Sequence, residues 1–159
     1  MTRASLERAI PAGDRLLLDS SCLISHLDGS EATSPLAIHV LDALVRSGRN
    51  PATVAMVSVM ETLVRPRQRT LEEYEHVLDF LKHHPNLKTQ PIDLAVAQEA
   101  ATMRAAFGFS TPDALVIATG VVCQVARLVT CDETWKTKLA GHRMSRRIRV
   151  VHLPDHLPG

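Results

Sequence analysis

The chain has 159 residues, 45% of them hydrophobic, which is enough to fold as one domain around its own core. Its 18 lysines and arginines nearly balance 17 acidic residues, and a net charge of +1 argues against nucleic-acid binding through a large basic surface. The apolar stretch from Ala114 to Cys123 is too short to cross a bilayer, and the N-terminus lacks the apolar run of a secretory signal. We therefore expect a cytoplasmic protein without membrane association.

The first half of the chain predicts strands that alternate with helices. The expected elements are a helical lead-in ending around Pro11, an apolar strand over 15–19, a short helix to Leu27 capped by Ser20 or Ser21, a helix over 34–48 opened by Ser34 and Pro35, a strand over 53–57, and a helix that stops near Pro66.

The second half continues the alternation. The expected elements are a helix capped by Thr70 with Leu71, Tyr74, Leu78 and Leu81 inward, a strand over 87–92, a helix from the cap Asp93 to about Ala106 with Gly108 beyond it, an apolar helix from Thr111, a strand over 127–130, a helix over 133–140, and a strand over 148–153.

This order predicts an α/β fold, a three-layer α/β/α sandwich with a mainly parallel sheet. We expect a single domain over residues 1–159, with an N-terminal extension over 1–14 and a short C-terminal tail over 154–159. In such folds the active site lies beyond the carboxyl ends of the strands.

Several familiar sites are missing from the sequence. There is no G-x-G-x-x-G or P-loop, no G-x-S-x-G and no H-E-x-x-H. The sequence therefore gives no support for a nucleotide cofactor, for acyl hydrolysis or for zinc proteolysis. The three cysteines form no C-x-x-C pair, and we interpret them as reduced and mostly buried. The eight histidines lack metal-ligand spacing on one helix, and we interpret them as surface residues.

Four acidic residues are placed to meet at one edge of the sheet. Asp19 ends the first predicted strand, Asp132 follows the fourth, and Glu61 and Asp113 begin helices. Carboxylates ~4 Å apart repel by about 1 kcal/mol even in water, so such a cluster favours a bound cation. Mg²⁺ prefers oxygen ligands and activates water for phosphodiester cleavage. The cluster therefore predicts hydrolysis of nucleic acid.

The contexts of these acids carry a resemblance to a known family. Leu-Leu-Leu-Asp19-Ser-Ser, Ser58-Val-Met-Glu61, Thr111-Pro-Asp113-Ala-Leu-Val-Ile-Ala and Leu-Val-Thr130-Cys-Asp132-Glu-Thr-Trp135 resemble the PIN-domain family, in particular the small VapC-type toxins of bacterial toxin-antitoxin pairs. The resemblance covers nearly the whole chain. It departs from the family at Trp135, where Phe is frequent, and in the longer lead-in.

The resemblance implies a Mg²⁺- or Mn²⁺-dependent endoribonuclease that forms homodimers and is blocked by a cognate antitoxin. Asp19, Glu61, Asp113 and Asp132 match the family's metal-binding and catalytic acids, and Thr130 matches a hydroxyl residue often found two before the last acid. We expect Asp19, Asp113 and Asp132 to bind the ion and Glu61 to ligate it or orient the attacking water.

Auxiliary roles are open for three neighbouring side chains. Ser20 or Ser21 could hydrogen-bond a water on the metal, although we favour a helix cap. Glu133 could be a substitute or extra ligand.

Structural roles compete with these assignments. Ser58-x-x-Glu61 is also the spacing of a capping box, the helix dipole alone favours Asp113 in a first turn, and Asp132 could cap the following helix. Asp19 is harder to explain by a structural role, because an acid at the end of a buried strand needs a partner or an ion.

Two groups of arginines are candidates for RNA binding. Arg65, Arg67 and Arg69 could grip phosphates near the metal, although we favour solvated loop charges for them. Arg146 and Arg147 belong to a basic segment before the last strand that suits RNA or an acidic partner equally. The alternative function is a PIN-like scaffold that binds RNA or protein without cutting.

Overall fold

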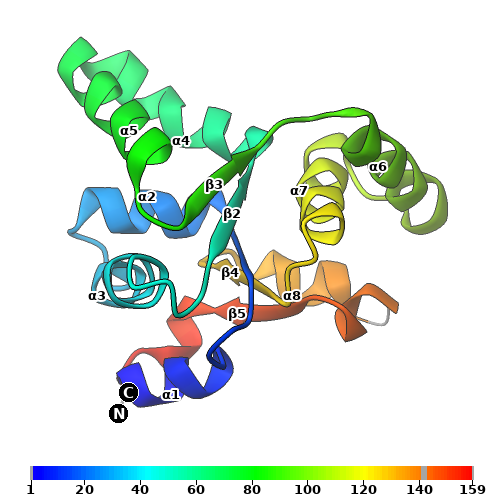
Figure 1. The fold of residues 1–159 in the computed structure, drawn as a ribbon, viewed down its shortest axis with the longest axis horizontal. Helices are drawn as coiled ribbons and strands as arrows, with labels where there is room; N and C mark the ends of the chain where they lie inside the picture. Colours follow the sequence, from blue (N-terminus) through cyan, green and yellow to red (C-terminus); the bar gives the residue numbers. More distant parts are fainter. Residues whose placement is uncertain (1, 141–142, 159) are drawn as a thin grey trace.

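The computed structural model describes residues 2–140 and 143–158, so residues 1, 141, 142 and 159 of the predicted domain lie outside the described part. Its centre is a five-stranded sheet in the order β3-β2-β1-β4-β5, and every neighbouring pair is parallel (Figure 1). The strands are β1 (Leu16–Leu18), β2 (Ala52–Ala55), β3 (Leu87–Gln90), β4 (Arg127–Thr130) and β5 (Arg149–His152). The predicted α/β fold is confirmed, with a sheet that is entirely parallel.

Helices cover both faces of this sheet. They are α1 (Thr2–Ala9), α2 (Ser20–Asp28), α3 (Ser34–Ile38), the π-helix η1 (His39–Val45), α4 (Met56–Arg69), α5 (Leu71–His83), α6 (Leu94–Phe107), α7 (Thr111–Val122), α8 (Thr134–Leu139) and the 3₁₀-helices η2 (Arg143–Arg146) and η3 (Leu153–His156). None of the helices in the described residues has the length and hydropathy needed to cross a membrane.

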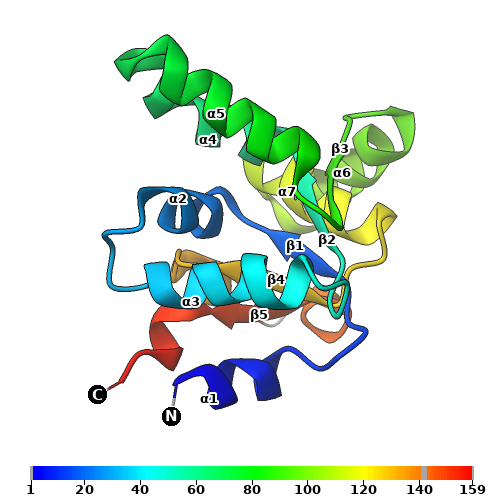
Figure 2. The ribbon, with the colours of Figure 1, turned by 60° about the vertical axis from the view of Figure 1, so that its left-hand side comes forward.

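Two buried clusters form the core, one on each side of the sheet. Leu16 and Leu18 of β1 face the cluster built with α1, α2, α3, η1 and α5. Leu17 faces the opposite cluster, built with α6, α7 and α8. Figures 1 and 2 show α2 and α3 on one side of the strands and α6 and α7 on the other. The apolar run of β1 is therefore buried on both faces, as expected for a central parallel strand.

Helix ends follow the expected capping chemistry at three positions. The Thr70 hydroxyl accepts a hydrogen bond from the Glu73 N–H at 3.1 Å, and Asp93 accepts one from the Val96 N–H at 2.9 Å. Gly108 ends α6 in the left-handed region, at φ 67°, where a side chain would be strained. These three caps confirm the predicted starts of α5 and α6 and the end of α6.

Helix α4 departs from the prediction at both ends. It begins at Met56, two residues before Ser58, and it continues through Pro66 to Arg69. Although Pro66 cannot donate to the preceding turn, its carbonyl accepts from the Thr70 N–H at 3.1 Å and closes the last turn. The predicted stop near Pro66 is therefore wrong.

The neighbouring helices also differ in detail. The helix predicted over 34–48 is capped by Thr33 and changes to π-helical turns at His39. In α5 the side chain at Leu71 is 60% exposed, whereas Val77 and Leu81 are buried, so the inward face lies further along the helix than predicted.

The histidine interpretation is wrong for several residues. His84 and His152 are buried. His26 stacks on Phe80 with ring centroids 5.0 Å apart, and the His84 Nε2 lies 3.0 Å from the Leu41 carbonyl oxygen. The rings of His26 and His84 thus pack against partners from distant parts of the chain. The cysteine interpretation holds, since all three are free, with Cys22 buried and the others partly buried.

The predicted N-terminal extension is part of the packed domain. Leu6 and Ile10 are fully buried in the core. The buried Asn50 amide donates to the carbonyl oxygens of Pro11 and Asp14 at 2.7 and 2.9 Å, which fixes the chain between α1 and β1. Helix α1 lies beside η3, as both views show (Figure 2).

Helix α7 approaches the sheet closely at Gly120. A Cβ at this position would lie 2.9 Å from Ile148 Cδ1, 3.0 Å from Val125 Cγ2 and 3.1 Å from Leu17 Cδ2. These separations are below the usual 3.5–4.0 Å contact between carbon atoms. The missing side chain therefore lets α7 sit against β1, with its first turn near the carboxyl edge of the sheet.

Candidate active site

A hollow opens at the carboxyl ends of the two central strands. The chain passes from β1 into α2 on one face and from β4 toward α8 on the other, which is the kind of switch point where parallel sheets bind ligands. The hollow has a volume of about 220 Å³. It is lined by the four predicted acids, Asp19, Glu61, Asp113 and Asp132, together with Ser20, Ser21, Pro112, Val116 and Trp135.

Asp19 is the most enclosed of the acids, with 7% of its surface exposed. Its Oδ2 accepts hydrogen bonds from the Thr130 hydroxyl at 2.8 Å and the Ser21 hydroxyl at 2.9 Å. Its backbone N–H donates to the Val129 carbonyl of β4 at 3.0 Å. Asp19 thus has a fixed position at the junction of β1 and α2, and Thr130, which is fully buried, acts by holding this carboxylate.

Glu61 lies on α4 and is held from α2. The Ser20 hydroxyl donates to Glu61 Oε2 at 2.6 Å. The cap of α2 is Asp19, and Ser20 and Ser21 lie in its first turn with their hydroxyls on carboxylates, so the interpretation of these serines as helix caps is wrong.

The capping-box alternative for Glu61 also fails. The residue at the N-cap of α4 is Ala55, and Ser58 lies inside the helix, with a buried hydroxyl that has no hydrogen-bond partner in the described residues. Glu61 belongs to the second turn and cannot reach back to an N-cap at Ser58. Its carboxylate is directed instead toward Ser20 and the hollow.

Asp113 lies in the first turn of α7, after the N-cap Ser110. Its N–H donates to the Ser110 hydroxyl at 3.4 Å. Both carboxylate oxygens face the Lys138 ammonium, with Oδ2 at 3.1 Å and Oδ1 at 3.2 Å from Nζ. Lys138 also lies over the Trp135 ring, 4.7 Å from its centroid.

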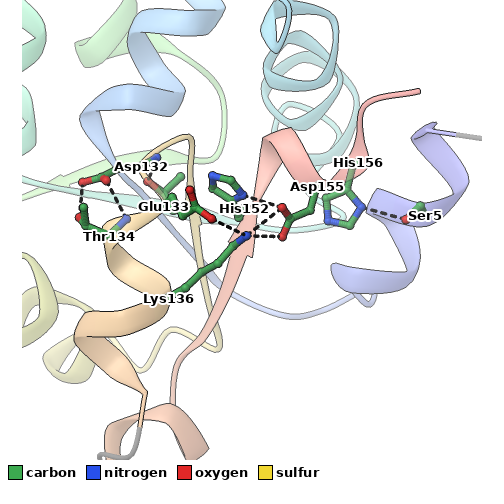
Figure 3. A network of polar contacts seen from close by, with 9 residues as sticks. Ser5, Asp132, Glu133, Thr134, Lys136, His152, Asp155 and His156 are labelled. Atoms are coloured by element: carbon green, nitrogen blue, oxygen red, sulfur yellow. Dashed lines mark hydrogen bonds and ion pairs between the residues drawn. The ribbon is translucent and has the colours of Figure 1, made fainter. Parts of the chain in front are cut away.

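Asp132 follows β4 and turns into α8. Its Oδ1 accepts from the Thr134 N–H at 2.9 Å and its Oδ2 from the Thr134 hydroxyl at 2.8 Å (Figure 3). Burial raises the pKa of Asp132, but the hydrogen bonds from Thr134 and the positive charges of Lys138 and His152 outweigh it and hold the pKa below its ordinary value. Asp132 is therefore an ionised acceptor at neutral pH.

Glu133 is directed away from the hollow. Its side chain is 81% exposed and extends toward Lys136, with 3.9 Å between Oε1 and Nζ. Figure 3 shows the two carboxylates of Asp132 and Glu133 diverging. The structure thus does not bring the predicted extra ligand into the site.

The donor atoms of the hollow fit a hard divalent cation. Four carboxylates and two hydroxyls line it, and oxygen is what Mg²⁺ and Mn²⁺ prefer. Among residues 2–140 and 143–158, no three acids, histidines or cysteines are already gathered into a coordination sphere. Mg²⁺ commonly uses one or two carboxylates and keeps several waters, so the lining suits it without such a cage.

The three arginines after Glu61 point in different directions, and they lie on a helix, not on a loop. Arg65 and Arg69 line a groove of about 310 Å³ between α2, α4 and α5, which also contains Asp28 and Glu73. Arg67 lies on the other side, over the Tyr74 ring at 5.0 Å. The groove begins one helical turn beyond the contact between Ser20 and Glu61, because Arg65 is four residues after Glu61.

The second basic segment is far from the acids. Arg146 and Arg147 are exposed, at the end of η2 and just before β5 begins. Because all strands are parallel, this is the amino edge of the sheet, opposite the hollow.

Sequence reasoning missed Lys138. It lies three residues beyond Trp135, outside the motifs around the four acids. The available signal is the spacing of three residues from Trp135 on a helix, which places the two side chains on the same face.

Comparisons with known proteins agree with this architecture. Residues 16–138 match the family model of the PIN domain. None of the curated proteins matches the chain at a significant level.

Among solved structures, the chain is similar to a toxin-antitoxin complex from Klebsiella pneumoniae, with a TM-score of 0.63, 17% identity, and coverage of 87% of this chain and 97% of that chain. FitAcB from Neisseria gonorrhoeae gives a TM-score of 0.62 and 16% identity over 87% of this chain and 97% of that chain. VapC20 from Mycobacterium tuberculosis, a sarcin-ricin loop cleaving toxin, gives 0.61 and 11% over 77% and 93%. At these identities the likeness concerns the fold.

Proposed function

The chain belongs to the PIN-domain family, and from this premise we propose that it is a Mg²⁺- or Mn²⁺-dependent endoribonuclease. PIN domains are typically metal-dependent nucleases. The observation that carries the proposal is the convergence of four carboxylates, from four separate segments of the chain, on one hollow at the carboxyl edge of the sheet. Such a cluster is costly without a cation, which makes a purely structural role a poor explanation of it.

Some of these side chains would bind the cation, and others would position the attacking water or another carboxylate. Asp19, Asp113 and Asp132 would hold the cation, and Glu61, fixed by the Ser20 hydroxyl, would ligate it or orient the attacking water. A bound Mg²⁺ or Mn²⁺ supplies Lewis-acid activation of that water and stabilises the leaving oxygen of the phosphodiester. Thr130 and Ser21 keep Asp19 in place through the two hydrogen bonds to its Oδ2.

The RNA strand would leave the hollow along the groove between α2 and α4. Arg65 is the first cation on this path and would contact a phosphate next to the cleaved one, with Arg69 one turn further. Arg67 faces Tyr74 instead and would not take part. Arg146 and Arg147 lie at the opposite edge of the sheet and would not touch the cleaved phosphate.

A cleavage assay tests the proposal directly. Purified protein is incubated with single-stranded and structured RNAs in Mg²⁺, Mn²⁺ or EDTA, alongside Asp19→Asn and the control Asp79→Asn. The control removes an exposed carboxylate on α5, which pairs with its helix neighbour His83 and does not line the hollow. We expect metal-dependent cutting that falls by at least about 100-fold in Asp19→Asn and is unchanged in Asp79→Asn.

Two outcomes would contradict the proposal. Undiminished cutting by Asp19→Asn would mean that the acids are not the active site. Absence of cutting with retained RNA binding would favour the non-cleaving scaffold.

The path of the strand has its own test and an internal control. RNA binding is measured in the non-cleaving Asp19→Asn background with Arg65→Ala or Arg67→Ala at several salt concentrations. Arg65→Ala should weaken binding and lower the slope against log salt by about 0.7, the value for one phosphate contact on a single strand. Arg67→Ala should change neither, and equal losses in both variants would contradict the assigned path.

We also propose that the protein acts as a homodimer and that an antitoxin blocks the hollow. The antitoxin is supported by the likeness of the fold to a toxin-antitoxin complex, whereas the homodimer rests on the resemblance to VapC-type toxins alone. Light scattering of the purified chain should give the mass of two chains, and a monomer at micromolar concentration would contradict the first part. Co-purification with the product of a neighbouring gene tests the second part.

A further inference from the structure

Lys138 is the one described cation that pairs with an acid of the hollow. Its ammonium lies 3.1 Å from Asp113 Oδ2 and 3.2 Å from Oδ1, so it faces both carboxylate oxygens at once. Asp19, Glu61 and Asp132 are held by the hydroxyls of serine and threonine instead. Asp113 therefore differs from the other three in having a full positive charge as its partner.

The position of Lys138 is fixed by one further contact, with the Trp135 ring. It lies on the same face of α8 as Trp135, and its ammonium is 4.7 Å from the centre of that ring, within the range of a cation–π contact. Trp135 is itself buried and lines the hollow. The ammonium therefore contacts both the Trp135 ring and the Asp113 carboxylate.

A divalent cation bound to Asp113 would lie close to this ammonium, because both would use the same carboxylate. Both oxygens of Asp113 face Lys138, and two cations within about 4 Å of each other repel strongly. The Lys138 side chain is 30% exposed, so it can move out into solvent without unpacking the core. The Lys138 ammonium and a bound metal ion would therefore compete for the Asp113 carboxylate.

We propose that Lys138 is a built-in counter-ion that competes with the divalent metal for Asp113. In the metal-free protein it neutralises Asp113 and holds it in place. On metal binding it gives up this carboxylate, so the metal affinity of the hollow is lower than the four acids alone would produce. This inference rests on the proposed function, because it deepens the metal requirement of the same site.

Lys136 supplies a matched control on the same helix. It is two residues from Lys138, and its ammonium pairs with Asp155 Oδ2 at 2.7 Å, next to His152, on the side of α8 away from the hollow (Figure 3). Replacing either lysine by methionine changes the net charge equally and keeps a long apolar stem. A difference between the two variants therefore reports the local pair and not the overall charge.

The experiment measures Mn²⁺ binding to the full chain by calorimetry or electron paramagnetic resonance, without RNA. We expect Lys138→Met to bind Mn²⁺ about tenfold more tightly than the wild type, and Lys138→Arg, which keeps the charge, to stay near the wild type. Lys136→Met should leave the affinity unchanged. In an Asp113→Asn background the effect of Lys138→Met should vanish, because the carboxylate for which Lys138 and Mn²⁺ compete is no longer present.

Several results would overturn the proposal. These are equal or weaker Mn²⁺ binding by Lys138→Met, an equal gain in Lys136→Met, a gain that persists in Asp113→Asn, and no Mn²⁺ binding by either the wild type or Lys138→Met. The outcome is separate from that of the proposed function. Mn²⁺ binding with the expected pattern but without RNA cleavage would overturn the nuclease assignment and leave the role of Lys138 intact.

Discussion

Replacement of Gly120 by alanine tests how the close packing of α7 positions the site. The added Cβ would lie 2.9 Å from Ile148 Cδ1 and 3.0 and 3.1 Å from Val125 and Leu17. Overpacking of this kind typically costs about 1–3 kcal/mol. Alanine gains about 1 kcal/mol over glycine inside a helix, so we expect a net loss of roughly 1 kcal/mol in the free energy of unfolding.

A second substitution isolates the contact with Ile148. Ile148→Val removes the δ carbon that the new Cβ would meet at 2.9 Å, and it costs about 1 kcal/mol on its own. In the Gly120→Ala background the same change should cost little, because it relieves the overlap. We expect a coupling of about 1 kcal/mol between the two positions.

Urea denaturation followed by circular dichroism gives the four free energies of this cycle. Additive costs would refute the reasoning, since they would mean that the side chains do not meet. A Gly120→Ala variant more stable than the wild type by the full helix-propensity gain would refute it as well. Because Asp113 lies in the first turn of the same helix, the variant should also bind Mn²⁺ more weakly if α7 is pushed from the sheet.

Three further predictions concern titration, reactivity and buried polar groups. Burial lowers the pKa of His26, so as the pH falls the unfolded chain takes up a proton before the folded chain does. The free energy of unfolding therefore decreases as the pH drops from about 7 to below 6.5, by at most about 1.4 kcal/mol per pH unit. His26→Phe should flatten this dependence in urea titrations, and an unchanged slope would contradict the shift. Burial raises the pKa of the Cys22 thiol well above its ordinary value, so iodoacetamide should not modify it until urea unfolds the chain. Peptide mass spectrometry checks this, and rapid labelling of the folded protein would contradict it. Asn50→Ala should lose about 1–3 kcal/mol, because the part-buried carbonyls of Pro11 and Asp14 lose their donor. A loss below about 0.5 kcal/mol would show that water replaces the amide.

Strand positions and the convergence of the acids were accessible from the sequence. The apolar runs around Leu17 and Leu128 end in polar residues, and parallel strands place such residues at a common edge. The placement of Asp19 and Asp132 at this edge follows from the strand pattern alone, without any information about distant contacts. The same holds for the caps at Thr70 and Asp93, which depend on residues three positions away.

Helix boundaries and buried polar side chains were not accessible in this way. The run over 53–57 fits a strand or the start of a helix equally, and the structure divides it after Ala55, which moves Ser58 inside α4. The burial of His84 depends on the Leu41 carbonyl, 43 residues away in the chain. Lys138 meets Asp113 across 25 residues, and no local pattern predicts that pair.

The order in which the acids occur along the chain has a consequence for biosynthesis. Thr130 and Asp19, which share a hydrogen bond, are 111 residues apart, and β4 enters the sheet between β1 and β5. A ribosome-bound chain that has exposed only its first half therefore contains Asp19 and Glu61 but neither Asp113 nor Asp132. Domains fold as units during synthesis, and long-range strand pairing is a late event. The proposed nuclease would thus be inert during most of its own translation, when messenger and ribosomal RNA are nearest to it.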